Sequence, residues 1–223
     1  MVGPNGAGKS TFLHALAGDG RMTSGEVCVE GRTLRRWKPA ELARRRAVLP
    51  QHTMLAFPFT ARQVVMMGRH PWASRPADDE AAVTEALRRA GVEDLADRSF
   101  PSLSGGEAAL VCLARALAQE TPVLLVDEPT ASLDVSHATQ SMAVLRDLAD
   151  AGRAVLCVVH DLNLAAAYAD RVAVMAAGRL AAVGPPSVVL TAELLSAVYG
   201  YPLDVVPHPR RPCPLVLAAD GTR

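Results

Sequence analysis

The chain has 223 residues, of which 50% are hydrophobic and 21% are charged. This composition is typical of a folded globular protein and argues against disorder, and the length is sufficient for a large buried core. Lysine plus arginine and aspartate plus glutamate both number 23, so the formal net charge is zero, and only 4% of the residues are aromatic. Because a non-specific nucleic-acid binder needs net basicity and stacking aromatic side chains, we expect no nucleic-acid partner.

The cysteines and the apolar stretches exclude further classes of protein. Four cysteines lie far apart and form no C-x-x-C pair, which argues against a zinc ribbon and against a disulfide scaffold. The best uncharged apolar stretch, residues 180–192, is too short to span a bilayer and contains Gly184, Pro185 and Pro186. We therefore expect any work at a membrane to take place by docking on another protein.

The first motif in the chain is a glycine-rich loop at residues 3–11 that fits the pattern G-x-x-x-x-G-K-[ST]. Glycines let such a loop turn its backbone N–H groups toward a phosphate, and the helix that follows presents its positive end to the same anion. We expect Lys9 to contact the β- and γ-phosphates of ATP and Ser10 to ligate Mg²⁺. The predicted nucleotide contacts of this loop are Gly3, Pro4, Asn5, Gly6, Ala7, Gly8, Lys9, Ser10 and Thr11.

The middle of the chain shows helical periodicity without a convincing strand. Apolar residues at helical spacing recur between residues 82 and 90, where Gly91 ends the run, and again between 110 and 117. The pattern predicts a helical subdomain over about 61–120, inserted into an α/β core.

A short apolar strand, residues 123–126, runs directly into Asp127 and Glu128. Ligands of parallel α/β sheets bind at the carboxyl ends of the strands, so both carboxylates are expected at a binding edge. Asp127 is suited to hold Mg²⁺ through water, and Glu128 to act as the general base for the attacking water.

The rest of the chain alternates helices and strands. We expect a helix over 136–151, with Ser136 as its N-cap and Gly152 just past its end. The predicted strands that follow are 154–159, a hairpin within 171–183, and short tail strands at 203–206 and 215–217.

Four further segments accompany the phosphate loop and the acidic strand. They are Gln51, the run Leu103-Ser104-Gly105-Gly106-Glu107, the run Ser132-Leu133-Asp134, and His160 after an apolar strand. In this order they resemble the Q-loop, signature, D-loop and switch histidine of the ATP-binding subunits of ABC transporters. The resemblance covers nearly the whole chain, and the signature before the acidic strand is specific to this family.

The resemblance implies the fold, the partners and the remaining site roles. The implied fold is an α/β P-loop NTPase core with a parallel sheet and an inserted helical subdomain. The implied divisions are a core segment 1–60, the helical subdomain 61–120, the rest of the core 121–200 and a tail 201–223. Two subunits of the family pair head to tail, so that the signature of one faces the ATP on the phosphate loop of the other.

In such a homodimer the implied catalytic residues are Glu128, His160 and Gln51. Ser104, Gly105, Gly106 and Asp134 would contact the nucleotide across the dimer, and the implied ligands of Mg²⁺ are Ser10, Gln51 and Asp127. His160 would contact the γ-phosphate. No site role is assigned to His52, His70, His137 or His208.

A closer resemblance rests on residues 44–52, 57–60, 67–69 and the tail motifs 198–202 and 205–209. These are similar to the bacterial hemin-importer ATPases, with the ATPases of iron-siderophore or cobalamin importers as the alternative. The implied partners are two transmembrane permease subunits and, indirectly, a periplasmic haem-binding protein. The implied location is peripheral, on the cytoplasmic face of the inner membrane.

The sequence departs from the family pattern in two places. Ala108, Ala109 and Leu110 follow the signature where the family usually carries polar and Arg residues, which would strip polar contacts from a face that meets ATP. The family also carries strands before the phosphate loop, so we expect N-terminal strands to be missing and a sheet edge to be left open. A catalytically impaired fragment is therefore a further alternative.

Overall fold

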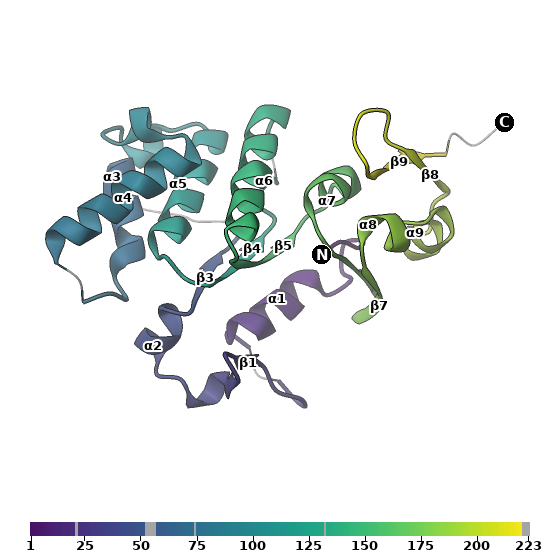
Figure 1. The fold of residues 1–223 in the computed structure, drawn as a ribbon, viewed down its shortest axis with the longest axis horizontal. Helices are drawn as coiled ribbons and strands as arrows, with labels where there is room; N and C mark the ends of the chain where they lie inside the picture. Colours follow the sequence, from purple (N-terminus) through teal and green to yellow (C-terminus); the bar gives the residue numbers. More distant parts are fainter. Residues whose placement is uncertain (21, 52–56, 74, 132, 220–223) are drawn as a thin grey trace. The chain divides into compact units, whose positions relative to one another are not determined.

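The computed structural model describes residues 1–20, 22–51, 57–73, 75–131 and 133–219. The chain divides into two compact units, one made of Met1–Leu13 with Val158–Arg223 and the other of His14–Cys157. Figure 1 shows the order of the elements along the chain. Within the described residues, no helix is both long and apolar enough to cross a membrane.

A three-stranded sheet forms the core of the His14–Cys157 unit. Its order is β3 (Arg46–Leu49), β4 (Val123–Asp127) and β5 (Ala154–Val158), and β3 runs parallel to β4 with Leu49 opposite Val126. The strands predicted at 123–126 and 154–159 are therefore confirmed. Leu124, Leu125 and Val126 are at most 5% exposed, as expected for a strand covered on both faces.

Helices supply the rest of this unit. The segment 61–120 is helical as predicted, and α4 ends where Gly91 adopts a left-handed conformation with φ of 68°. Its helices, α3, α4 and α5, pack on one another, and α5 and α4 also contact α6. The elements are α3 (Ala61–Met66), η2 (Met67–Arg69), α4 (Pro76–Ala90), η3 (Glu93–Leu95), η4 (Phe100–Ser102), α5 (Gly105–Ala118) and α6 (Val135–Asp150). Before β3 lie β1 (Cys28–Val29), β2 (Arg32–Thr33), η1 (Leu34–Arg36) and α2 (Pro39–Ala43).

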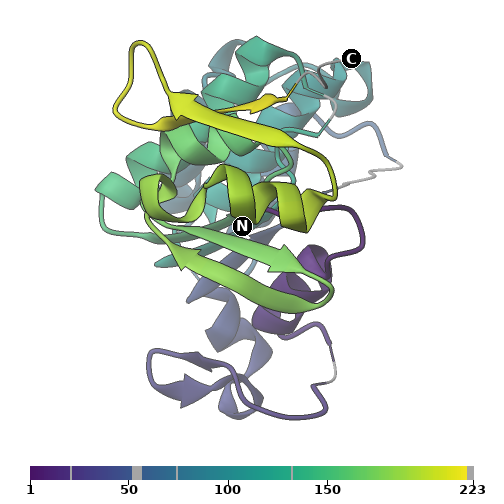
Figure 2. The same cartoon turned by 90° about the vertical axis from the view of Figure 1, so that its right-hand side faces the viewer.

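The other unit holds the start of α1 (Lys9–Ala17) and two antiparallel hairpins. The first hairpin, β6 (Val172–Ala176) with β7 (Arg179–Gly184), and the second, β8 (Leu203–Pro207) with β9 (Pro214–Ala218), confirm the strands predicted there. Figure 2 shows the helices α8 (Pro186–Val189) and α9 (Ala192–Tyr199) between the two hairpins. The helix α7 (Leu162–Tyr168) packs against β9.

Met1 and Val2 hold a strand position in this unit. The Val2 N–H donates to the Ala173 carbonyl, the Met175 N–H donates to the Val2 carbonyl, and the Val159 N–H donates to the Met1 carbonyl, at 2.9, 2.9 and 3.0 Å. Met1 is 7% exposed and Val2 is fully buried. Backbone pairing on both sides therefore fixes the point at which the phosphate loop begins.

Candidate nucleotide-binding site

The phosphate loop closes around the side chain of its own lysine. The Lys9 ammonium is 5% exposed and donates to the carbonyl oxygens of Gly3 and Pro4 at 2.9 and 3.0 Å. Gly3 has φ of 150°, and a Cβ added there would lie 2.2 Å from the Met175 carbonyl oxygen of β6. Only glycine allows this approach of the backbones, so the sequence requires glycine where the loop leaves the sheet.

The charge of the loop suits a polyphosphate. The helix α1 begins at Lys9, so its positive end and the lysine ammonium lie at the same turn of the chain. Gly8 has φ of 93°, a conformation that strains any side-chain-bearing residue. This combination of a glycine-rich turn, a buried ammonium and a helix N-terminus is the chemistry by which proteins hold phosphate groups.

Gln51 and Glu128 meet at the carboxyl edge of the three-stranded sheet. Because Leu49 lies opposite Val126 in the parallel pair β3–β4, the residues two positions further along both strands leave the sheet side by side. The Gln51 Nε2 donates to a Glu128 carboxylate oxygen at 2.6 Å. Asp127, the last residue of β4, is 3% exposed. The sequence predicted Asp127 and Glu128 at this edge, and the family resemblance implied a role for Gln51, which the structure places beside Glu128.

Glu128 also has an unusual backbone. Its φ of 50° lies in the left-handed region, which a residue with a Cβ rarely adopts. Such strain costs of the order of 1–3 kcal/mol and gathers at functional sites, where surrounding structure holds it. Glu30, Glu120 and Ala177 have similar φ values, so the role assigned to Glu128 rests on its place after β4 and its contact with Gln51.

The signature residues form the N-terminus of α5. Ser104 is the N-cap: its hydroxyl accepts from the Glu107 N–H at 3.3 Å, and its own N–H donates to the Glu107 carboxylate at 2.7 Å. Glu107 also pairs with Arg98 at 3.0 Å. Hydrogen bonds from the Ser104 N–H and hydroxyl, with the Arg98 charge, lower the pKa of Glu107. The turn 104–106 is thereby fixed, with a helix N-terminus suited to an anion.

Leu110 does not lie where the sequence reasoning placed it. It is 2% exposed, inside the helical packing around α5, while Ala108 and Ala109 are partly buried. Leu110 belongs to the apolar face of α5 that recurs through residues 110–117, and this face packs in the core. The apolar residue at position 110 is therefore explained by its burial in the core.

Asp134 caps the helix α6, and the predicted N-cap Ser136 is wrong. The Asp134 carboxylate accepts from the His137 N–H at 2.9 Å and lies 2.8 Å from the His137 Nδ1. An aspartate three residues before a free N–H satisfies it better than Ser136, which lies inside the first turn. Ser132 of the predicted D-loop lies outside the described residues.

His160 follows Val159, whose N–H bonds to the Met1 carbonyl. Gly3 directly follows Val2, and His160 directly follows Val159. Because the segments 1–2 and 159 are hydrogen-bonded, His160 and the start of the phosphate loop follow adjacent backbone segments of one unit. The described residues therefore group the predicted site by unit. The phosphate loop and His160 lie in one unit, and Gln51, Asp127, Glu128, the signature and Asp134 lie in the other.

Comparisons with known proteins identify the family. The family model described as ABC transporter matches residues 1–131, which is more than half of the chain. The chain belongs to the ABC transporter family. It is 55% identical over 219 residues to the hemin import ATP-binding protein HmuV of Nocardia farcinica, and the match covers 97% of this chain and 76% of that protein. It is 56% identical over 219 residues to the protein of the same name from Streptomyces coelicolor, covering 97% and 78%.

Solved structures agree with this assignment. A metal-chelate type ABC transporter in an inward-facing conformation matches with a TM-score of 0.83 at 27% identity, covering 99% of this chain and 86% of that one. A dimeric, post-hydrolysis ATP-binding cassette bound to ADP and phosphate matches with a TM-score of 0.73 at 27% identity, covering 82% and 83%. The predicted fold class and the assignment of this ABC chain as a nucleotide-binding ATPase are confirmed.

The possible metal ligands of the chain fit a Mg²⁺ ion that is bound together with a nucleotide. Among the described residues, no three His, Cys, Asp or Glu side chains gather to hold a metal ion. Mg²⁺ in ATPases is held through one or two carboxylates with substrate phosphates and water, so a dedicated protein cage is not required. Asp127, at the end of a buried strand, supplies such a carboxylate. Ligation by Ser10, Gln51 and Asp127 stays a prediction.

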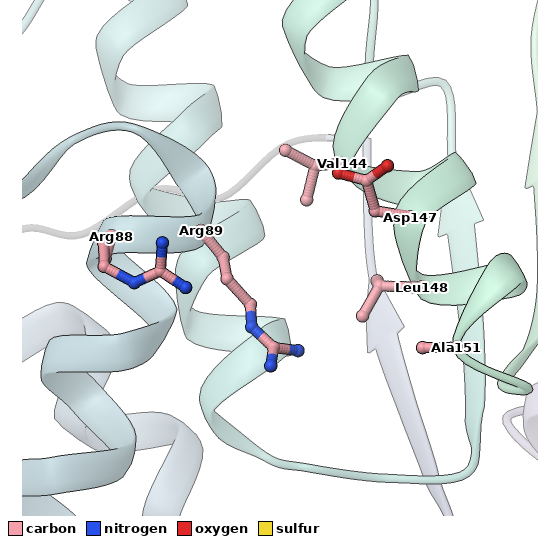
Figure 3. Close-up of a pocket in the computed structure, with 6 residues that line it drawn as sticks. All are labelled: Arg88, Arg89, Val144, Asp147, Leu148 and Ala151. Carbon is pink, nitrogen blue, oxygen red and sulfur yellow. The ribbon is translucent and has the colours of Figure 1, made fainter.

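A pocket of about 360 Å³ lies elsewhere, between α4 and α6. Figure 3 shows the two arginines that line it from α4, and the residues that line it from α6 and from the C-cap of that helix, Ala151. None of the predicted site residues lines it. The lining residues are Arg88, Arg89, Val144, Asp147, Leu148 and Ala151.

Sequence reasoning missed the role of one residue beside the site. His137 was given no site role, although the spacing Asp-x-x-His at the start of a helix is a signal for a side chain that returns to its N-cap. In the structure it contacts both Asp134 and Gly106.

Proposed function

We propose that the chain is the ATP-hydrolysing subunit of an importer whose cargo is hemin. The observation that carries the proposal is 55% identity, over 97% of the chain, to a hemin import ATP-binding protein. The geometry of the phosphate loop, of the Gln51–Glu128 pair and of the signature helix supports the ATPase part independently of that name.

The proposed reaction uses the chain's own residues in defined roles. Lys9 and the loop N–H groups hold the phosphates of ATP, and Glu128 accepts a proton from the water that attacks the γ-phosphorus. A P–O bond to that water forms while the bond to the β-phosphate oxygen breaks, which gives ADP and phosphate. Mg²⁺ bound with ATP supplies neutralisation of the phosphate charge.

Gln51 has a positioning role in this scheme. Its amide donates to the Glu128 carboxylate at 2.6 Å, so it holds the base in one orientation at the sheet edge. His160 is proposed to contact the γ-phosphate from the unit that carries the phosphate loop.

The proposed assembly is a homodimer on two permease subunits. Ser104, Gly105, Gly106 and Asp134 would serve the ATP that the partner subunit holds, since the positive N-terminus of α5 is a second site for an anion. Closure of such a dimer on ATP would move the permease, with a periplasmic haem-binding protein delivering the cargo. The proposed location is peripheral, on the cytoplasmic face of the inner membrane.

One observation supports an alternative cargo from the same chemical class as hemin. The structure that matches with a TM-score of 0.83 is a metal-chelate type ABC transporter, and hemin is itself a metal chelate. Ferric siderophores and cobalamin belong to the same chemical class and are the alternative cargo.

Reconstitution with the permease tests the proposal. The chain is placed in liposomes with a hemin-importer permease and its binding protein, and uptake of hemin, a ferric siderophore and cobalamin is measured with and without ATP. We expect ATP-dependent uptake of hemin and none with the Lys9→Ala variant. Uptake of another chelate in its place would contradict the cargo, and absence of ATP turnover with the permease would contradict the function.

A further inference from the structure

His137 lies between the D-loop and the signature helix, both within the His14–Cys157 unit. Its Nδ1 is 2.8 Å from one Asp134 carboxylate oxygen, and its backbone N–H donates to the other at 2.9 Å. The backbone and the ring of His137 therefore each contact the carboxylate of Asp134, the N-cap of α6. The side chain is 30% exposed, so most of the ring is covered.

The covered part of the ring lies against Gly106. A Cβ added to Gly106 would lie 2.8, 2.9 and 3.1 Å from the Nδ1, Cγ and Cε1 atoms of His137. Side-chain carbons essentially never approach other atoms that closely, so the ring occupies the space that any larger residue would need. A Cβ at the neighbouring Gly105 would meet nothing within 4 Å.

This contact explains why position 106 is glycine. Gly106 lies in the first turn of α5 without a left-handed backbone, so its conformation alone does not require glycine. The requirement comes from the imidazole that Asp134 holds in place. One rigid ring thus sets the distance between the start of α5 and the start of α6.

We infer that His137 is a positioning residue that couples the D-loop to the signature, by holding Asp134 with its Nδ1 and Gly106 with its ring. The inference rests on the proposed function, in which both segments face the nucleotide of the partner subunit. Loss of the ring lets the two helix starts move independently, and displacements of about 1 Å can cost up to 10²-fold in rate. A helix-capping role alone would affect stability and leave turnover unchanged.

Four single substitutions and one double substitution separate these roles. His137→Ala removes the ring and the bond to Asp134, whereas His137→Asn keeps a donor near the Nδ1 position. Gly106→Ala places a Cβ against the ring, Gly105→Ala is the matched control with open space, and Gly106→Ala/His137→Ala removes the conflict. The readouts are ATP turnover in the reconstituted transporter, nucleotide affinity of the isolated chain and its melting temperature.

We expect His137→Ala to lower kcat roughly 10-fold or more, with nucleotide affinity of the isolated chain unchanged and His137→Asn close to the parent. When His137→Ala is added to Gly106→Ala, it should raise turnover and melting temperature instead of lowering them. The double variant should therefore turn over faster and melt higher than Gly106→Ala. Gly105→Ala should melt at or above the parent temperature.

Two results would overturn the inference. One is a parent that hydrolyses ATP with the permease while His137→Ala matches it in kcat. The other is a double variant that melts no higher than Gly106→Ala, which would show that the ring does not limit position 106. A parent without turnover would instead count against the proposed function, and the melting temperatures would still decide the contact between His137 and Gly106.

Discussion

Glu128 combines a left-handed backbone, with φ of 50°, and a carboxylate that accepts a 2.6 Å hydrogen bond from Gln51. The sequence predicted a role for Glu128 from the apolar strand before it, and the family resemblance implied a role for Gln51. It could not predict their contact, which depends on the register of β3 against β4 across 77 positions of the chain. The strain at Glu128 has no sequence signal either, since non-glycine residues rarely occupy this conformation.

The Glu128→Gln variant tests the assigned base. Glutamine keeps the size and polarity of the side chain but cannot accept the proton of the attacking water, so turnover should fall by about 10²–10⁴-fold while ATP binding is retained. Glu30→Gln is the matched control, because Glu30 is exposed and also has φ of 50°. Steady-state phosphate release with the permease measures the effect. Turnover within about threefold of the parent would show that another group is the base.

At the scale of elements, two helix starts are stabilised by carboxylates with lowered pKa values. Hydrogen bonds from Ser104 lower the pKa of Glu107 at α5, and hydrogen bonds from the His137 N–H and side chain lower the pKa of Asp134 at α6. A carboxylate with a lowered folded-state pKa stabilises the fold above its ordinary pKa, and that stabilisation is lost as the pH falls through the lowered value. The free energy of unfolding should therefore decrease from about pH 4.5 downward.

The Glu107→Gln variant isolates one of these helix starts. Glutamine retains both hydrogen bonds of the capping box but has no titrating carboxyl group, so the slope of stability against pH below about 4.5 should become shallower while stability at pH 7 changes little. Glu107→Ala, which also loses the hydrogen bond from the Ser104 N–H, should be less stable at pH 7 than Glu107→Gln. Urea unfolding between pH 3 and pH 7 measures both. An unchanged slope in Glu107→Gln would remove Glu107 from the acid transition.

The helical elements are also joined by a buried arginine that sequence patterns do not reveal. Arg69 of η2 is 7% exposed and donates to Asp79 of α4 at 2.8 Å, and to the Ala118 carbonyl and Glu120 carboxylate at the end of α5, both at 2.7 Å. Periodicity predicted these helices, since their apolar faces repeat at 3.6 residues. It could not show that the side chain of Arg69 links α4 to the end of α5, to which it is bonded across 49 and 51 positions of the chain.

Removal of this side chain should destabilise the helical packing. Arg69→Leu removes the hydrogen bonds that Asp79, the Ala118 carbonyl and Glu120 accept from the guanidinium, and the loss should be about 2–4 kcal/mol in the free energy of unfolding. Arg69→Lys should lose less, because it keeps one charge but not the forked geometry. Arg75→Leu is the matched control, since Arg75 pairs with Asp78 at the surface and should cost at most about 1 kcal/mol. Equal losses for Arg69 and Arg75 would contradict the assigned role.

For the whole molecule, the sequence predicted the fold class and the order of its motifs. Those features are local, because a glycine-rich loop, an acidic strand end and a capping box each occupy only a few consecutive residues. Contacts made by tertiary packing were not accessible in this way. The burial of Leu110 and the contact of His137 with Gly106 depend on which elements pack together, and the N-cap of α6 depends on a competition between Asp134 and Ser136.

A head-to-tail dimer makes a prediction that no single subunit can satisfy. Ser104→Arg places a bulky cation at the start of α5, where the ATP of the partner subunit would bind. Because that residue does not serve the ATP on its own phosphate loop, the isolated variant should keep its nucleotide affinity within about threefold while turnover with the permease is abolished. Lys9→Ala should behave differently and lose affinity in the isolated chain, since Lys9 lies within the loop itself.

Mixed dimers test the same shared site through the number of nucleotides bound per dimer. When one subunit carries Lys9→Ala and its partner carries Ser104→Arg, both defects fall in one composite site and the second site is intact. When one subunit carries both changes and its partner neither, each site contains one defect. The measurement is the number of nucleotides retained per dimer after rapid filtration, in the Glu128→Gln background. We expect one nucleotide per dimer in the first arrangement and none in the second. The reverse result, none in the first arrangement and one in the second, would show that each subunit builds its site alone, because both defects then fall in one site only when they lie in the same subunit.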